Sequence, residues 1–385
     1  MASSEGITTL TVDCLCKGNT YPIDVPTSKL PLAGYMCHCN KCRHMTGGLY
    51  SPHIILPAPQ SAVSFAGLSE YPFSDNANSY FCPTCSTPLF FNWQREQTKL
   101  WGIMVGALQN DPGDLVKFTT NAYVSDTIDG GASMWLRKPN TDDSEARRFE
   151  ERSTGPEIPP DWPAVSSFTG YEKKLEDEVP VRCLCNGVRF VMKRGNYEGN
   201  TKDELPWFID PKTHKQIANF CACDSCRLFS GVDIFNWTYA ELNHITCSDG
   251  TPLPGHVKGL KELVDSKDPS IGTLKYYTSR SDVQRYFCEV CSGSIFYAVD
   301  SRPEHVDVAI GAIEASDGAR AEGLLSWDFG NVMQSVDADG GWRENLMKRV
   351  KEESEWWRIE RGYPKNWRRA QREEKEKAKE KYTDN

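Results

Sequence analysis

Short segments rich in β-branched and aromatic residues recur along the chain, and each is bounded by Gly, Pro, Asn or Asp. They occupy residues 53–57, 89–93 and 100–108 in the first half and residues 294–299 and 306–313 in the second. Segments of this length and composition are typical of strands. The pattern therefore predicts a mainly β fold.

The carboxyl-terminal part of the chain has a different pattern. Residues 342–382 are rich in charged side chains and predict helix, interrupted near Gly362 and Pro364. Large apolar side chains in this segment predict that its first half packs on a domain; they are Trp342, Trp356, Trp357 and Trp367.

The cysteines follow one spacing pattern that occurs twice: C-x-C, then C-x-C-x-x-C, then C-x-x-C. The first copy contains Cys14, Cys16, Cys37, Cys39, Cys42, Cys82 and Cys85, and the second contains Cys183, Cys185, Cys221, Cys223, Cys226, Cys288 and Cys291. Cys247 is the one cysteine of 15 outside the pattern, and we expect it to be a buried or idle thiol.

The residues around the cysteines repeat as well. DCLCKG corresponds to RCLCNG, CHCNKCRHMTGG to CACDSCRLFSG, and SYFCPTCSTPLFF to RYFCEVCSGSIFY. Three motifs in the same order indicate an internal duplication. The second copy is longer over residues 192–220 and 240–282, where we expect surface loops.

The duplication predicts four parts of the chain. A first domain covers residues 1–140 and a second covers residues 178–341, each with C-x-x-C turns of the zinc-knuckle type. A polar, Pro-rich linker over residues 141–177 joins them, and a charged helical extension covers residues 342–385.

Composition narrows the setting in which these cysteines act. With 39% hydrophobic residues the chain can form packed cores, and its net charge of −9 argues against a nucleic-acid-binding protein. The sequence contains neither a signal peptide nor an apolar run long enough to span a membrane. We therefore expect a cytoplasmic protein whose cysteines bind metal or act in catalysis instead of forming disulfides.

Seven cysteines per copy divide naturally into four and three. Four thiolates close the shell of a structural Zn²⁺, here Cys14, Cys16, Cys82 and Cys85, and Cys183, Cys185, Cys288 and Cys291. The triplets Cys37, Cys39, Cys42 and Cys221, Cys223, Cys226 would leave one position of a second Zn²⁺ open.

Two alternatives to an open zinc site remain. All the cysteines could be structural, with a nearby His, Asp or water completing each triplet. In the first copy His38, His44 or His53 could do this, although the second copy has Ala222 and Leu228 where the first has His38 and His44. An iron-sulfur cluster is less favoured, because C-x-C-x-x-C is not a usual ferredoxin spacing.

Charge predicts what an open site would bind. Three thiolates on Zn²⁺ leave a net charge of −1, which disfavours activation of water and suits a soft ligand. A free thiol has a pKa of about 8.5, and coordination deprotonates it. We therefore expect a small-molecule thiol, or an adduct of one, as the fourth ligand.

At these residues the sequence resembles the glutathione-dependent formaldehyde-activating enzyme family, or CENP-V/GFA domain family, which has an Mss4-like β fold. The resemblance rests on the three cysteine motifs, on VGAL and IGAI, and on AYVSDTIDGGASMWL with its remnant SVDADGGW. It implies two tandem domains with structural and catalytic zincs, glutathione as co-substrate, and a carbon-sulfur lyase or synthase of the S-(hydroxymethyl)glutathione synthase type. The catalytic residues would then be the two triplets.

The sequence also departs from the family pattern. Ser86 and Ser292 replace the Gly that usually follows the last cysteine, and Ser79 replaces an Arg that the second copy retains as Arg285. Neither copy is singled out as the working one, so one active and one degenerate copy is an alternative. Another is a non-catalytic, zinc-stabilised module for protein interaction.

The residue that moves the proton is not identified by the motifs. His44, His53 and Asp224 are polar residues near the cysteines, but lone polar residues of this kind more often serve packing or the surface.

Overall fold

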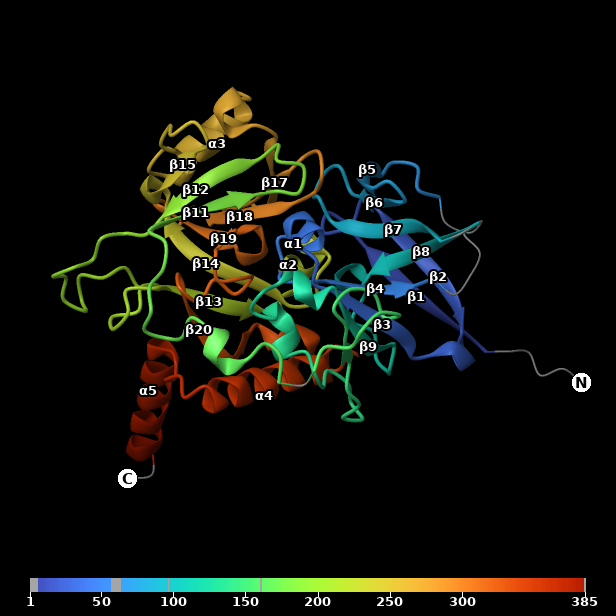
Figure 1. Ribbon diagram of the computed structural model, residues 1–385. Coiled ribbons are helices and arrows are strands. Elements are labelled where there is room, and N and C mark those ends of the chain that lie inside the picture. The colour runs from blue at the N-terminus through green and yellow to red at the C-terminus, as the bar shows by residue number, and fades with distance from the viewer. Residues whose placement is uncertain (1–5, 57–63, 96, 160, 384–385) are drawn as a thin grey trace, which may run out of the picture.

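The computed structural model describes residues 6–56, 64–95, 97–159 and 161–383, and it shows a mainly β protein with two large sheets (Figure 1). The first sheet has the order β10-β9-β3-β4-β8-β7-β6-β5, and the second has the order β20-β13-β14-β19-β18-β17-β16. Seven strands therefore occur in the same order in both sheets. The pairs β3 with β9 and β13 with β20, which are equivalent in the two sheets, are parallel, and β10 adds a further parallel strand beside β9.

The first sheet is built from β3 (Leu32–Cys37), β4 (Ser51–Ile55), β5 (Ser69–Ser74), β6 (Ala77–Phe81), β7 (Pro88–Arg95), β8 (Thr98–Met104), β9 (Val116–Ala122) and β10 (Arg147–Arg148). The second is built from β13 (Gln216–Cys221), β14 (Phe235–Glu241), β16 (Leu274–Arg280), β17 (Val283–Cys288), β18 (Ser294–Val299), β19 (His305–Ala309) and β20 (Leu325–Met333).

A smaller sheet accompanies each large one. β1 (Ile7–Asp13) pairs with β2 (Thr20–Pro26), and β11 (Glu178–Arg182), β12 (Arg189–Lys193) and β15 (Ile245–Cys247) form a three-stranded sheet. In β2 the buried Ile23 and Val25 alternate with the exposed Pro22 and Asp24, the period-two pattern of a strand with one covered face. Strands β13 and β17 are buried along their whole length.

Two short helices lie between the large sheets in the middle of the molecule (Figure 1). Helix α1 (Asn40–Thr46) belongs to the first repeat and α2 (Asp224–Ser230) to the second. Each helix packs against a 3₁₀ turn of the other repeat, α1 against Ile310–Ala312 and α2 against Val105–Ala107.

Backbone hydrogen bonds join the repeats reciprocally at these turns. The Gly106 amide donates to the Gly231 carbonyl over 3.0 Å, and the Gly311 amide donates to the Gly47 carbonyl over 2.8 Å. A Cβ on Gly106 or Gly311 would collide with the backbone of the other repeat. The glycines of VGAL and IGAI are therefore explained by a contact that admits no side chain, and Gly47 and Gly231 by φ angles of 74° and 73°, which favour glycine.

The prediction of strand over residues 100–108 and 306–313 is wrong at its carboxyl ends. Strand β8 ends at Met104 and β19 at Ala309, and the apolar residues that follow form the 3₁₀ turns. These turns are apolar because the opposite repeat buries them, so the sequence pattern is that of an interface and not of a longer strand.

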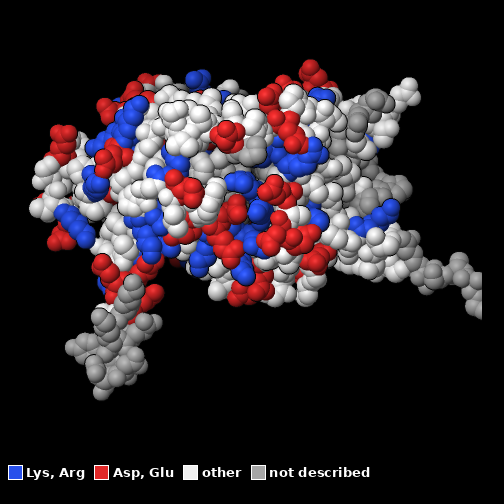
Figure 2. All heavy atoms as spheres, turned by 60° about the horizontal axis from the view of Figure 1, so that its bottom comes forward, with Lys and Arg blue, Asp and Glu red and all other residues white. Residues whose placement is uncertain are grey.

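The predicted helix break in the carboxyl-terminal extension is confirmed by helices α4 (Glu344–Glu360) and α5 (Trp367–Thr383). Helix α4 packs on β20 and contains the buried Trp357 and the exposed Trp356. Trp342, which precedes the helix, is also buried. Acidic and basic side chains are interspersed over the face that carries α4 (Figure 2).

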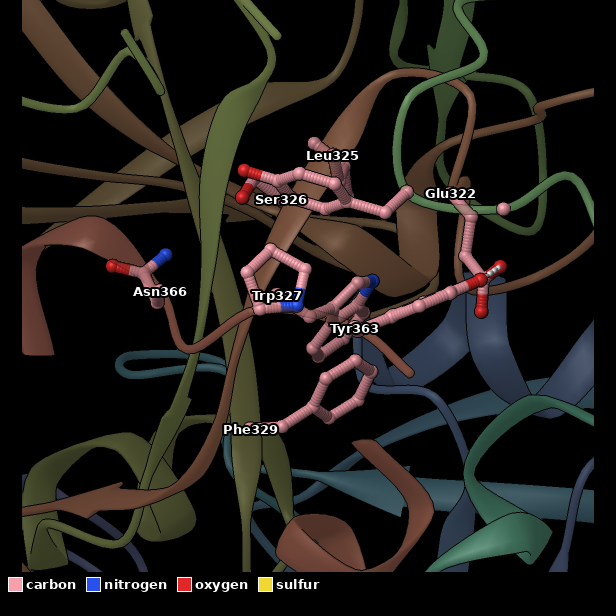
Figure 3. A pocket seen from close by; sticks show the side chains of 10 residues that line it. Glu322, Leu325, Ser326, Trp327, Phe329, Tyr363 and Asn366 are labelled. Carbon is pink, nitrogen blue, oxygen red and sulfur yellow. Dashed lines mark hydrogen bonds between the residues drawn. The ribbon is translucent and has the colours of Figure 1, made fainter. Parts of the chain in front are cut away.

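The turn between α4 and α5 is anchored on the second repeat. The Tyr363 hydroxyl donates to Glu322 over 2.9 Å, and the Tyr363 ring lies 6.5 Å from that of Phe329 (Figure 3). The cavity left between these side chains is about 10 Å³, which is at most the space of one water molecule. The extension is thus packed onto its domain.

The long insertions of the second repeat are partly structured, contrary to the prediction of surface loops. Residues 240–282 include β15 and α3 (Val257–Asp265). Residues 192–220 include Phe208, which is fully buried in a small cluster with Tyr197 and Tyr239. Both insertions contain apolar residues that need burial, which the length difference alone does not reveal.

Part of the predicted linker pairs with the first large sheet, and further hydrogen bonds join the two halves of the chain. Residues 147–148 pair with β9, and the carboxylate of Asp129 accepts hydrogen bonds from the backbone amides of Ala319 and Arg320 across the two halves.

Among the described residues, no helix is long and apolar enough to cross a membrane.

We expect Gly311→Ala to lower the free energy of unfolding by about 1–3 kcal/mol, because the added methyl group must displace the Gly47–Gly48 backbone. Chemical denaturation of the metal-loaded chain measures the effect. Gly255→Ala is the matched control, since a Cβ there has open space. Equal stability of both variants would contradict the reciprocal glycine contact.

Candidate zinc sites and the cavity of the second repeat

The structure brings the cysteines together in the four groups expected from their spacing. The sulfurs of Cys14, Cys16, Cys82 and Cys85 all lie within 4.8 Å of one another, as do those of Cys183, Cys185, Cys288 and Cys291. The triplets Cys37, Cys39, Cys42 and Cys221, Cys223, Cys226 are equally compact. These groups could hold zinc, because thiolates at such separations can share one ion.

Turns with left-handed residues shape the four-cysteine groups. Lys17, Ser86, Asn186 and Ser292 each follow a cysteine pair and have φ between 58° and 61°. Ser86 and Ser292 therefore adopt the conformation that explains why a glycine is usual after the last cysteine.

Hydrogen bonds to sulfur stabilise these groups further. In the first, the amide of Asn19 donates to Cys14 over 3.2 Å and its side chain donates to Cys82 over 3.3 Å. In the second, the amide of Val188 lies 3.3 Å from the sulfur of Cys183. Donors directed at sulfur favour thiolates, the form that binds metal.

Without a cation, the thiols of one group cannot all ionise. Hydrogen bonds from Cys14 and Cys85 lower the pKa of Cys82, whereas bonds with Cys14 and Cys82 raise the pKa of Cys85 far above its ordinary value. Cys288 and Cys291 show the same division, with Cys288 lowered and Cys291 raised. Four thiolates in one place need a divalent ion between them, so the donor set fits Zn²⁺.

Each four-cysteine group lies close to a tyrosine of the other repeat. Burial, followed by the charges of Cys291 and its group, raises the pKa of Tyr71 to about 12. Burial and the charges of Cys16 and its group likewise raise the pKa of Tyr277. The two groups therefore lie next to the interface between the repeats.

The triplets lie where β3 and β13 run into the short helices. Cys39 caps α1 and Cys223 caps α2, each accepting a hydrogen bond over 3.3 Å from the amide of the cysteine three residues later. Each helix thus fixes the sulfur of its capping cysteine relative to the sulfur of the cysteine three residues later, in the first turn of the helix.

Among the described residues, the first triplet's group includes no histidine. His38 bonds to Asn121 over 2.9 Å, His44 bonds to the Arg182 carbonyl over 3.1 Å, and His53 lies between the rings of Tyr35 and Phe91. Burial lowers the pKa of all three to about 4, so they are neutral at pH 7. Hydrogen bonds thus account for His38 and His44, and ring contacts account for His53.

The second triplet opens onto a cavity of about 510 Å³, a volume in the range of small-molecule sites. All three cysteines border it. Its charged lining residues are Arg280, Arg285, Arg302 and Asp307, and its aromatic ones include Trp237, Tyr239 and Tyr297. The lining contains three guanidinium groups and one carboxyl group, that of Asp307, which is paired with Arg302 over 2.7 Å. Cationic side chains therefore outnumber the carboxyl group, which suits an anion.

Arg285 connects the cavity to the triplet. Its guanidinium is buried, donates to the Cys226 sulfur over 3.6 Å, and lies 5.0 Å from the ring centre of Tyr297. Trp237 also donates to Cys226, over 3.4 Å. Hydrogen bonds from Cys221 and Cys223, then the charge of Arg285, hold the pKa of Cys226 well below its ordinary value. A buried arginine beside thiols is itself a sign that they carry negative charge.

The first triplet has a different surrounding. Strand register matches Arg285 to Ser79, Arg280 to Ser74 and Asp307 to Gly102. A Cβ on Gly102 would collide with the ring of Phe91, so that ring fills the space given to the Asp307 side chain in the second repeat. His53 packs against Phe91 at 4.7 Å. Two serines and a glycine thus stand in the first repeat where the second has Arg285, Arg280 and Asp307.

The motifs alone do not identify Arg280, Arg302 and Asp307. One signal was available, because Asp307 interrupts the apolar run VDVAIGAI at the position where the first copy has Gly102. An acidic residue in a buried strand requires either a partner or a function.

Comparison with known protein families gives one match. Residues 9–126 match the model described as "Glutathione-dependent formaldehyde-activating enzyme". The matched range contains all seven cysteines of the first copy, so the first repeat is similar to this family. Comparisons with curated proteins and with solved structures gave no match.

We expect metal analysis of the full chain to find about four zinc ions, and Cys288→Ser to lose one. The substitution should also lower the free energy of unfolding by more than about 4 kcal/mol, because a buried metal site is broken. Cys247→Ala is the control, since this buried thiol lies outside all four groups. Two zinc ions in the wild-type chain would contradict metal binding by the triplets.

Proposed function

We propose that the chain forms or cleaves a carbon-sulfur bond between glutathione, or a closely related thiol, and a small electrophile, and that it does so at the Cys221–Cys223–Cys226 site. The observation that supports this proposal is the cavity of about 510 Å³, which is lined both by the three cysteines of the triplet and by three arginines. The family match of residues 9–126 lies in the first repeat, and it supports the reaction type for the second repeat through the cysteine motifs that the two share.

The charges of the cavity suit glutathione. Its thiol is flanked by two carboxylates, and guanidinium groups are the preferred partners of carboxylates. Arg280 lies 68% exposed, where it can meet a group entering from solvent, whereas Arg302 lies deeper, with 24% of its side chain exposed. Sulfur at the triplet and carboxylates at the arginines would fix the thiol at three points.

Zinc held by the triplet would supply positive charge that favours the thiolate form of an incoming thiol. The residues of the chain do the rest. Arg285 offsets the negative charge of the cysteines, and the Tyr239, Tyr297 and Trp237 rings exclude water from one wall. Such an arrangement would hold thiolate and electrophile close together in a fixed orientation. This favours their reaction over the same reaction in bulk water.

We further propose that the first repeat is the degenerate copy. Its triplet can hold zinc, but Phe91 occupies the space above Gly102, and serines replace two of the arginines. Its contribution is then to support the second repeat across the shared glycine interface. We also propose that the chain holds four zinc ions, that its domain boundaries lie at residues 140, 178 and 341, and that the protein is cytoplasmic.

Serine substitutions in the two triplets should have unequal effects. We expect Cys223→Ser to abolish turnover of glutathione adducts and Cys39→Ser, its equivalent in the first repeat, to retain at least half of it. Circular dichroism and zinc content verify that both variants are folded. Loss of activity in Cys39→Ser alone would assign the reaction to the first repeat, and full activity in both would exclude catalysis at the triplets.

Calorimetry should detect about one glutathione per zinc-loaded chain. Arg285→Ser, which copies Ser79 of the first repeat, should weaken binding at least tenfold, because a buried charge beside the sulfur is lost. Two equivalents per chain would show that both triplets accept the thiol. Absence of binding would favour the non-catalytic interaction module.

A further inference from the structure

One carboxyl group lines the cavity without belonging to any cysteine motif. Asp307 lies on β19, and strand register places Tyr239 of β14 on one side of it and Tyr297 of β18 on the other. Only 8% of the residue is exposed, and this remaining surface faces the cavity that contains the triplet.

The surroundings of Asp307 hold its carboxyl group in place. Arg302, from the loop after β18, lies 2.7 Å from Oδ1 and stacks 5.7 Å from the Tyr239 ring centre. Arg302 also lies 5.9 Å from the ring centre of Trp207, which belongs to the long insertion. The charged and titratable groups around Asp307 are Arg302, Arg285, Cys226, Tyr239 and Tyr297.

These groups have opposing effects on the carboxyl group. Burial is the largest and raises the pKa of Asp307 to about 7, although Arg302 lowers it. The charge of Cys226 raises it further, and that of Arg285 lowers it. At neutral pH both protonation states are therefore present, which is the condition for a group that both accepts and donates a proton.

We propose that Asp307 is the proton carrier of the second repeat's site: its carboxylate accepts the proton of an entering thiol, and its carboxyl group returns that proton to the oxygen of a carbonyl electrophile. This assignment rests on the proposed function. It suits a carbonyl electrophile in the proposed function, because addition of sulfur to the carbonyl carbon places negative charge on the carbonyl oxygen, which the carboxyl group of Asp307 can protonate.

The step balances without any further reactant. The thiol S–H bond breaks and its proton moves to Asp307; the sulfur electron pair forms the carbon-sulfur bond; the carbonyl π pair moves to oxygen, which takes the proton from Asp307. The product is a hemithioacetal, and the reverse sequence cleaves it. Asp307 ends each cycle as the carboxylate from which it began.

The first repeat provides a natural contrast. Gly102 occupies the equivalent position and Phe91 fills the space, so the first site has no carboxyl group at this place. If the first repeat is the degenerate copy, the glycine at position 102, with the Phe91 ring beside it, accounts for the loss of the proton carrier.

Counting protons by calorimetry tests the assignment without any electrophile. Glutathione is titrated into the zinc-loaded full chain at pH 7.0 to 8.0, in buffers of different ionisation enthalpy, for wild type, Asp307→Asn and Asp307→Glu. We expect fewer than one proton released per glutathione in wild type and in Asp307→Glu, and about one in Asp307→Asn. Equal release in all three, with binding retained, overturns the assignment and leaves the proposed function intact.

Exchange kinetics provide the second measurement. Glutathione and formaldehyde form a hemithioacetal spontaneously, and exchange NMR measures how far the chain accelerates this. We expect Asp307→Asn to lower the acceleration at least about 100-fold and to remove its pH dependence near pH 7, with Asp307→Glu restoring part of both. Unchanged rates in Asp307→Asn overturn the assignment. A wild-type chain that neither binds glutathione nor accelerates exchange overturns the proposed function, and this assignment with it.

Discussion

Two close backbone contacts between the repeats determine how the rest of the molecule is arranged. Gly106 against Gly231 and Gly311 against Gly47 bring each short helix onto a turn of the other repeat, at hydrogen-bond distance. Arg227 extends one of these contacts by donating to the carbonyls of Gly106 and Leu108, over 2.8 and 2.7 Å. Because each helix also contains a cysteine of its triplet, the interface and the candidate sites are fixed by the same elements.

Within this nearly symmetric framework the two triplets have acquired different electrostatic surroundings. Arg285 and Trp237 both donate to Cys226, and hydrogen bonding with the other two cysteines makes it the most acidic thiol of the second triplet. In the first triplet Cys39, the helix cap, is the thiol whose pKa is lowered, to about 3, by hydrogen bonds from Cys37 and Cys42. Arg285 and Trp237 thus give the second triplet hydrogen-bond donors from neighbouring strands, in addition to the hydrogen bonds among its own cysteines.

The sequence was sufficient for the parts that depend on local spacing. The mainly β class, the two sheets and the grouping of the cysteines follow from motifs only a few residues long. The turns at residues 105–107 and 310–312 were not foreseen, because an apolar run does not reveal that another domain covers it. The cavity could not be foreseen either, since Cys226, Arg302 and Asp307 lie on separate elements and meet only through strand register. Arg285 was noted as a motif residue, but its contact with sulfur was not.

Covalent linkage of the repeats has a consequence for how such a protein can diverge. In a homodimer with an isologous interface, every substitution appears in both subunits, so a change that closes one pocket closes both. In this chain Gly102 and Asp307 occupy equivalent places and differ freely, because each is encoded once. Fusion therefore allows one half to lose catalytic residues and keep only a supporting role. Because the two halves are covalently linked, their interface does not depend on protein concentration.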